Sequence, residues 1–280
     1  MKLGVCAQPE AAAVLAAAGF DYMEVNVVRD LQPELPDDAV AAQLTALRDL
    51  PLPAPVANVF LPGALKLTGA AVDLGAVERY VRTAFARAAA AGIEIIVFGS
   101  GAARRIPDGF DRARAWAQLV DFGRLIGPLA VDHGVTIAVE PLNYAECNVL
   151  NTVAESAQYV RDVAESAQYV RDVAESAQYV RDVDHPGVRL LVDAYHWARN
   201  EEPADAIVAA GPLLVHAHIA TYANRLAPGQ EPCDFAPFFA ALRNADYVGA
   251  LSVEARGDVD LAWAQATHAA LQDLLAASGA

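Results

Sequence analysis

Eight short stretches of apolar and β-branched residues alternate along the chain with alanine-rich stretches of helical period. Several of the short stretches, such as IEIIVFGS and VRLLVD, are unbroken apolar runs, which is typical of parallel strands covered on both faces. Strand–helix alternation implies parallel pairing through helical crossovers. Eight such units within 280 residues predict an α/β fold, a closed (β/α)8 barrel, built as a single domain over residues 1–280. A doubly wound open sheet is the alternative, but no GxGxxG follows the first strand.

The expected strands and helices have the following limits. We expect strands at 3–7, 22–25, 54–59, 93–99, 136–140, 189–193, 215–219 and 250–254. Helical patterns occupy 11–18, 38–47, 72–91, 112–133, 205–210, 235–245 and 261–277.

A perfect tandem repeat lies between the fifth and sixth expected strands. The decapeptide VAESAQYVRD occurs three times without a difference, at 153–162, 163–172 and 173–182. Each copy favours helix because it is rich in Ala, Glu, Gln and Arg. Removing two copies restores an ordinary length for one strand–helix–strand unit, so two copies are in excess. We interpret the repeat as a recent or deliberate duplication without a function of its own.

The three copies cannot form one straight helix that packs on its own barrel. Such a helix would be roughly 45 Å long, and the four residues 184–187 that follow it reach at most about 14 Å. We therefore expect one copy to dock as the barrel helix. The other two should loop out, form a projecting helical hairpin, or pass into a partner molecule as a domain swap that gives a homodimer. Because the copies are identical, the sequence does not tell which one docks.

The charge and the cysteines limit the kinds of partner and compartment. A formal net charge of -15, with no visible basic face, speaks against nucleic acid. Cys6, Cys147 and Cys233 are scattered and odd in number, so neither a disulfide framework nor a CxxC metal site is expected. The N-terminus lacks the apolar core of a signal peptide, and no run of about 18 apolar residues is present. We expect a cytoplasmic protein that makes no membrane contact and acts on a small molecule.

Metal-ligating side chains stand at or near the ends of the last four expected strands. They are Glu140, Asp193, His218 and Glu254. Because the carboxyl ends of parallel barrel strands open onto one face, these four side chains can converge on one ion. Three carboxylates and an imidazole suit Mn²⁺ best, with Mg²⁺, Co²⁺ or Zn²⁺ also possible.

The segments around these residues resemble those of a known superfamily. VEPLNYAECNVLNT (139–152), LLVDAYHW (190–197), VHAHIATYANRLAPG (215–229) and GALSVEA (249–255) are similar to the metal-binding segments of the D-tagatose/D-psicose 3-epimerase group. That group belongs to the xylose-isomerase-like TIM barrel superfamily of sugar phosphate isomerases and epimerases. FGSGAARRIPDGF (98–110) and ANVFLPGALKLTG (57–69) also resemble loops of this superfamily.

The resemblance implies the role of further residues. By analogy, the four strand-end residues are the metal ligands, and Glu146, His196 and Arg225 contact a sugar or sugar phosphate. Arg225 lies one residue further from His218 than in the epimerase pattern, and the intervening IATYAN lacks the glutamate common in sugar epimerases. The substrate loop is therefore expected to differ, and with it the substrate.

The chemistry that fits is proton transfer next to a ketose carbonyl through an enediolate stabilised by the divalent ion. Glu140 and Glu254 would act as the catalytic base and acid on its two faces. Return of the proton to the opposite face is epimerisation, and return to the neighbouring carbon is isomerisation. The alternatives are an endonuclease-IV-like enzyme, an inositol-pathway dehydratase or isomerase, and a non-catalytic or engineered barrel.

Some nearby residues have plainer interpretations. We expect His216 and His218 to point in opposite directions, with His218 facing the barrel interior and His216 as the substitute ligand. Cys147 is expected to be a small apolar filler. Arg104 and Arg105 contact a phosphate or else lie in a solvated loop or an ion pair. Glu24, at the end of the second strand, is expected to be a carboxylate of the site that is less important than the four ligands.

Overall fold

The computed structural model describes residues 1–171 and 187–279, and its strands form a closed parallel barrel. Each strand pairs with its neighbour in sequence, and β8 pairs with β1 from Lys2 opposite Ala250 to Val5 opposite Val253. The strands are β1 (Lys2–Cys6), β2 (Tyr22–Asn26), β3 (Val56–Asn58), β4 (Ile95–Phe98), β5 (Thr136–Val139), β6 (Val188–Asp193), β7 (Leu214–Ile219) and β8 (Ala250–Val253). The predicted (β/α)8 TIM barrel is confirmed.

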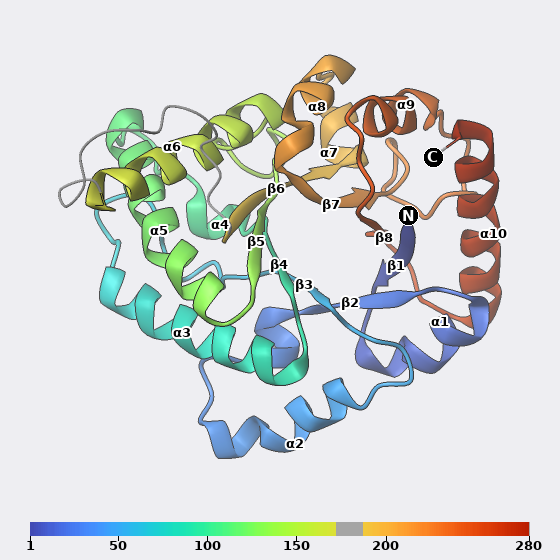
Figure 1. The fold of residues 1–280 in the computed structure, drawn as a ribbon, viewed down its shortest axis with the longest axis horizontal. Coiled ribbons are helices and arrows are strands. Elements are labelled where there is room, and N and C mark those ends of the chain that lie inside the picture. The colour runs from blue at the N-terminus through green and yellow to red at the C-terminus, as the bar shows by residue number, and fades with distance from the viewer. Residues whose placement is uncertain (172–186, 280) are drawn as a thin grey trace.

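Helices surround the barrel on its outside (Figure 1). They are α1 (Ala12–Ala18), α2 (Asp37–Arg48), α3 (Leu74–Ala91), α4 (Gly101–Arg104), α5 (Arg112–Asp132), α6 (Val153–Arg171), α7 (Ala194–Arg199), α8 (Ala204–Ala210), α9 (Ala236–Asn244) and α10 (Leu261–Ser278). Short 3-10 turns occupy Pro9–Ala11 and Gly211–Leu213, and a π-helical turn occupies Val27–Leu31. Within the described part of the chain, no helix has both the length and the apolar character needed to cross a membrane.

Alternate residues of each strand face the barrel interior, because side chains of a strand point to its two faces in turn. A small buried cluster from β2 to β6 fills this interior, and it consists of Tyr22, Val56, Val97, Ala138 and Leu191. A much larger apolar cluster lies between the strands and the helices. Any residue two positions beyond an interior residue again faces inward, at the mouth of the barrel.

The first copy of the decapeptide docks on the barrel. It forms the first half of α6, which packs against α5. The buried Tyr159 hydroxyl donates to the carbonyl of Leu119 at 3.0 Å, and the indole of Trp116 donates to Asp162 at 2.7 Å. The helix continues into the second copy as far as Arg171. Residues 172–182, which contain the end of the second copy and all of the third, lie outside the described residues, so the expected loop, hairpin or domain swap and the homodimer remain predictions.

Candidate active site

The four predicted metal ligands meet at the mouth of the barrel. One ligand atom from each of Glu140, Asp193, His218 and Glu254 can be chosen so that all lie within 4.8 Å of one another. His218 Nδ1 lies 3.7 Å from Glu140 Oε1, 3.8 Å from Asp193 Oδ2 and 3.3 Å from Glu254 Oε2. Each of the four ligands lies two positions after a strand residue of its own segment. These strand residues are Ala138, Leu191, His216 and Ser252, in the order of the ligands. Period-2 alternation therefore turns all four toward the barrel axis.

The atoms that face this point are buried and lack partners. Glu140 Oε1, Asp193 Oδ2 and His218 Nδ1 form no hydrogen bond with any described residue. Buried polar atoms are nearly always paired, so three orphaned atoms aimed at a common point indicate a missing electropositive partner. A divalent cation fits this donor set of three carboxylates and one imidazole.

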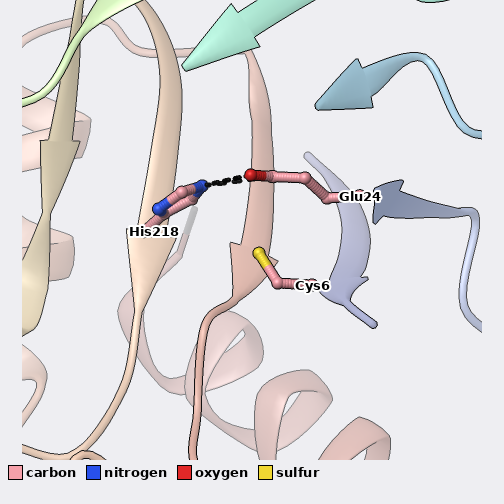
Figure 2. A group of neighbouring side chains, drawn as sticks. All are labelled: Cys6, Glu24 and His218. Atoms are coloured by element: carbon pink, nitrogen blue, oxygen red, sulfur yellow. Dashed lines mark hydrogen bonds and ion pairs between the residues drawn. The ribbon is translucent and has the colours of Figure 1, made fainter. Parts of the chain in front are cut away.

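Glu24 determines which nitrogen of His218 faces the site. His218 Nε2 lies 3.1 Å from both carboxylate oxygens of Glu24, so that this nitrogen carries the proton and donates to Glu24. The lone pair of Nδ1 is then free for a cation. Figure 2 shows Glu24 reaching from β2 to His218, with the thiol of Cys6 pointing toward the pair.

We expected His216 to point away from His218. Instead, both side chains lie on the same side of β7. His216 Nε2 lies 3.0 Å from Glu24 and 3.2 Å from the hydroxyl of Ser252, and the two imidazole rings are 5.0 Å apart. The expectation was wrong because residues two apart on a strand share a face. His216 thus helps to bind Glu24 below the site.

Local structure orients the carboxylates of Asp193 and Glu140. Asp193 caps the N-terminus of α7, where Oδ1 accepts from the backbone N–H groups of Tyr195 and His196 at 2.6 and 3.1 Å. Oδ2 is therefore left for the site. At Glu140, the neighbouring Gly99 leaves room for the carboxylate, because a Cβ on Gly99 would overlap Glu140 Oε2.

Arg104 fixes the backbone that carries Glu140. Its buried guanidinium donates to the carbonyls of Phe98, Glu140 and Leu150 at 3.0, 2.7 and 3.1 Å. The two interpretations offered for Arg104, phosphate contact or a solvated loop or ion pair, were both wrong. The neighbouring Arg105 donates to the carbonyl of Glu146 at 2.8 Å.

The expected substrate residues lie beside the ligand cluster. Glu146, His196 and Arg225, together with Glu140 and Glu254, line one cavity of about 520 Å³. His196 Nε2 lies 3.8 Å from Glu140 Oε1 and 4.0 Å from Glu146 Oε2. Arg225 Nη2 donates to Glu254 Oε2 at 2.5 Å, and its guanidinium lies 4.9 Å from the centre of the Tyr195 ring. Contacts on two sides therefore hold the Arg225 cation at the cavity wall.

The buried charges shift one another's pKa values. Burial raises the pKa of Glu140, and Glu254 adds to that rise, although His218 opposes it. Burial by itself would raise the pKa of Glu254 as well. His218 and Arg225 outweigh this effect and lower the pKa of Glu254 to about 2. Burial works toward a lower pKa at His218, but Glu24, Cys6 and Glu140 together outweigh it, so the pKa of His218 lies well above its usual range. Without a metal, His218 therefore holds a proton among the carboxylates.

The family follows from the sequence match. Residues 12–276 match the family described as the xylose isomerase-like TIM barrel. The chain belongs to this family. The resemblance inferred from the strand-end segments is confirmed.

Two relatives of this xylose isomerase-like barrel are sugar epimerases by name. The D-psicose 3-epimerase of Agrobacterium fabrum (strain C58) is 32% identical over 145 residues, which cover 51% of this chain and 43% of the relative. The L-ribulose 3-epimerase of Methylomonas sp. (strain DH-1) is 31% identical over 126 residues, which cover 45% of this chain and 37% of the relative. The matched segments thus span less than half the length of these curated relatives.

Solved structures of similar proteins share the whole fold. A crystal structure of D-psicose 3-epimerase in the presence of D-fructose has a TM-score of 0.77 and 23% identity, with 100% of both chains covered. D-psicose 3-epimerase with D-tagatose from Clostridium cellulolyticum H10 has a TM-score of 0.78 and 18% identity, with 99% of both chains covered. At this level of identity, the similarity shows the fold alone.

The sequence did not single out Asn143, although it lies within the family-like segment. Its backbone N–H donates to His196 Nδ1 at 3.1 Å, and its side-chain amide lies 2.9 Å from both His196 Nδ1 and Glu146 Oε1. Since Nδ1 accepts a backbone hydrogen bond, the proton of a neutral His196 is on Nε2, which faces the cavity. The bridging position of Glu24 was also missed, because only the fold brings β2 next to the inward face of β7.

The described cysteines form no disulfide. All three are free thiols. Cys147 is buried, with its thiol 3.6 Å from the carbonyl of Gly101. This position matches the expectation of a small filler.

Proposed function

We propose that the chain is a divalent-metal-dependent sugar isomerase or epimerase that moves a proton on the carbon next to a ketose carbonyl. The observation that carries the proposal is the convergence of the orphaned ligand atoms of Glu140, Asp193 and His218 with Glu254. Of these four residues, Glu140 and Glu254 line the cavity of about 520 Å³. The sugar epimerase names of the relatives support the choice of substrate class.

Glu140, Asp193, His218 and Glu254 would hold the ion. When bound, a divalent cation at these residues polarises a carbonyl and stabilises the negative charge that develops during proton removal. Mn²⁺ is the ion we expect, and Mg²⁺, Co²⁺ or Zn²⁺ are the alternatives. Among the described residues, the two groups able to hold a metal both include His218, which favours one ion over the several used by an endonuclease-IV-like enzyme.

The side chains of this site would divide the remaining work. Glu140 and Glu254 exchange the carbon-bound proton, one as base and the other as acid, by way of an enediolate. His196 offers its Nε2–H to a substrate oxygen, because Asn143 holds the ring by its other nitrogen. Arg225, anchored by Glu254 and Tyr195, places a positive charge where negative charge develops. Glu146, at the rim, accepts from a substrate hydroxyl.

The test is proton exchange with solvent. Protein stripped with EDTA and reloaded with Mn²⁺ is incubated in D2O with D-psicose, D-fructose, D-tagatose and L-ribulose, and NMR follows the loss of C–H signals beside the carbonyl. We expect metal-dependent deuterium incorporation. Absence of exchange with every ketose, at full Mn²⁺ occupancy, would refute the proposed function.

One substitution tests the acid/base assignment. Glu254→Gln should lower exchange by about 10²–10⁴-fold, the usual contribution of a general acid or base. Metal content is measured in parallel, since Glu254 is also an expected ligand. The control is Glu78→Gln on the exposed side of α3, where Glu78 pairs with Arg82 and with no other described residue. Exchange within tenfold of wild type in metal-loaded Glu254→Gln would refute the assignment.

A further inference from the structure

A second cavity adjoins the proposed active site on the same face of the barrel. It has a volume of about 570 Å³ and lies at the carboxyl ends of β8, β1, β2 and β3. It shares Asn58, Val59 and Glu254 with the cavity of about 520 Å³ that contains the other site residues. Each volume falls in the range of about 300–1,000 Å³ that holds a drug-sized ligand. A single six-carbon sugar therefore leaves one of the two cavities empty.

Small residues at the strand ends leave this space open. Cys6 ends β1, Ala7 follows it, and Gly257 follows β8 with a φ of +119°. Val59 stands between the two cavities with a φ of +50°, a conformation rare for a β-branched residue, and its side chain is 43% exposed. Backbone strain of this kind tends to cluster at ligand sites.

Polar side chains without partners line the second cavity. Asn58 is only 9% exposed, yet its amide forms no hydrogen bond with any residue of the described chain. Its polar atoms are not among the fully enclosed side-chain atoms that lack a partner, so a ligand or water in the cavity can reach them. The side chains of Gln8, Glu10 and Asp258 also line this cavity and form no hydrogen bond within the described chain. Together they offer amide donors and carbonyl and carboxylate acceptors, the groups that pair with sugar hydroxyls.

The charge of the cavity disfavours anions. Its walls carry the carboxyl groups of Glu10, Glu24, Glu254 and Asp258. The cation on the same walls, Arg29, is already held by Asp30 at 2.6 and 2.7 Å. Glu24 and Glu254 are held by the histidines and by Arg225, so the carboxylates of Glu10 and Asp258 are the ones that a phosphate group would meet, and among the described lining residues the cation Arg29 is already paired.

From these observations we infer that the second cavity is a subsite for a neutral glycosyl group joined to the ketose. The substrate of the site is then a glycosylated ketose rather than a sugar phosphate. This inference rests on the proposed function, since it assigns the substrate class of that same site.

Three ketoses that differ only at O6 provide the test. They are D-fructose, isomaltulose, which carries a glucosyl group on O6, and D-fructose 6-phosphate. We expect the Mn²⁺-loaded protein to exchange isomaltulose with a kcat/KM at least about tenfold above D-fructose, as two or three added hydrogen bonds allow. D-fructose 6-phosphate should fall at least about tenfold below D-fructose, because of repulsion by the cavity carboxylates.

Variants at the far wall of the subsite locate the effect. Gln8→Ala and Asp258→Ala should each reduce the ratio of kcat/KM for isomaltulose to that for D-fructose by about threefold or more. Glu10→Lys should raise kcat/KM for D-fructose 6-phosphate relative to D-fructose. The subsite would be overturned if the isomaltulose ratio stayed unchanged in Gln8→Ala and Asp258→Ala and the D-fructose 6-phosphate ratio stayed unchanged in Glu10→Lys.

The outcomes separate this inference from the proposed function. Exchange of D-fructose with no preference for isomaltulose refutes the subsite and leaves the function standing. If no ketose exchanges, the proposed function fails. Calorimetric titration with isomaltulose and with D-fructose 6-phosphate then tests the subsite independently of activity. Tighter binding of isomaltulose than of D-fructose 6-phosphate, weakened in Gln8→Ala, then supports it. Equal or tighter binding of the phosphate overturns it.

Discussion

Removal of the Glu24 carboxylate should weaken metal binding although Glu24 does not face the metal site. Glu24 accepts from His218 Nε2 at 3.1 Å and from His216 Nε2 at 3.0 Å. It thereby keeps the proton of His218 on Nε2 and the lone pair of Nδ1 directed at the other ligands. We expect Glu24→Ala to leave His218 free to rotate and to change tautomer, and Glu24→Gln to preserve the shape while it removes the charge.

The size of the effect follows from the two contacts. Loss of the outer partner of a metal-binding histidine lowers metal affinity by about 10–100-fold, which is about 1.4–2.7 kcal/mol. Glu24→Ala removes the acceptor of a buried N–H as well as the charge, so it should lie near the 100-fold end. In Glu24→Gln the amide oxygen still accepts from His218. The amide N–H can donate to Nε2 of His216 once the proton of that ring is on Nδ1, which has no other partner among the described residues, so this variant should lie near the tenfold end.

Calorimetric titration of EDTA-stripped protein with Mn²⁺ measures both variants. Thermal unfolding in EDTA shows whether each variant is folded before the titration. The matched control is Glu10→Gln, which removes a carboxylate from the adjacent cavity but contacts neither histidine. If Glu24→Ala binds Mn²⁺ within twofold of wild type, the positioning role of Glu24 is wrong.

Two further predictions concern the carboxylate of Glu140 and the proton on His218. Gly99→Ala should lower exchange by about 10²-fold, since its Cβ would displace Glu140 Oε2 and small misplacements of reacting groups are costly. The control is Gly75→Ala at the start of α3, which should leave exchange unchanged. Equal activity of the two variants would contradict the reasoning. Mn²⁺ binding at pH 7 should release about one proton, because the pKa of metal-free His218 is raised well above its usual range. Below that raised pKa the affinity for Mn²⁺ should increase with pH, because the proton must leave before His218 can ligate. The same calorimetry in buffers of different ionisation enthalpy counts the proton, and a heat of binding that is independent of buffer would count against it.

The convergence of Glu140, Asp193, His218 and Glu254 could be predicted from the sequence because it depends on two regular features. Parallel strands in a barrel end on one face, and residues two apart on a strand share a side. Glu140 and Glu254 directly follow observed strands, and Asp193 is the last residue of β6. The same periodicity, applied wrongly to His216, gave the one error in the direction of a site residue. The strand ends themselves varied by one or two residues, as at β3, where the expected 54–59 became Val56–Asn58.

Other features depend on packing that no local pattern encodes. Arg104 lies in a loop-like GSGAARR segment, yet its guanidinium is buried and binds three carbonyls. Three identical decapeptides carry no local information on which one docks. The choice comes from their neighbours, because Glu202 accepts from the backbone N–H groups of Val153 and Ala154 at 2.8 and 3.2 Å and so caps the first copy.

The docking of the first copy also explains how the candidate site keeps its geometry despite the duplication. The β5–α6 segment carries Glu140, Asn143 and Glu146, and its geometry is fixed on the N-terminal side of the repeat. Asn151 holds this segment by donating to the carbonyls of Leu142 and Cys147 at 2.8 and 3.0 Å. Because the helix begins at the same cap whatever its length, the turns of the first copy that pack on α5 do not depend on the residues that follow them. A repeat inserted before Asn151 would instead displace Glu140, Asn143 and Glu146 of the candidate site.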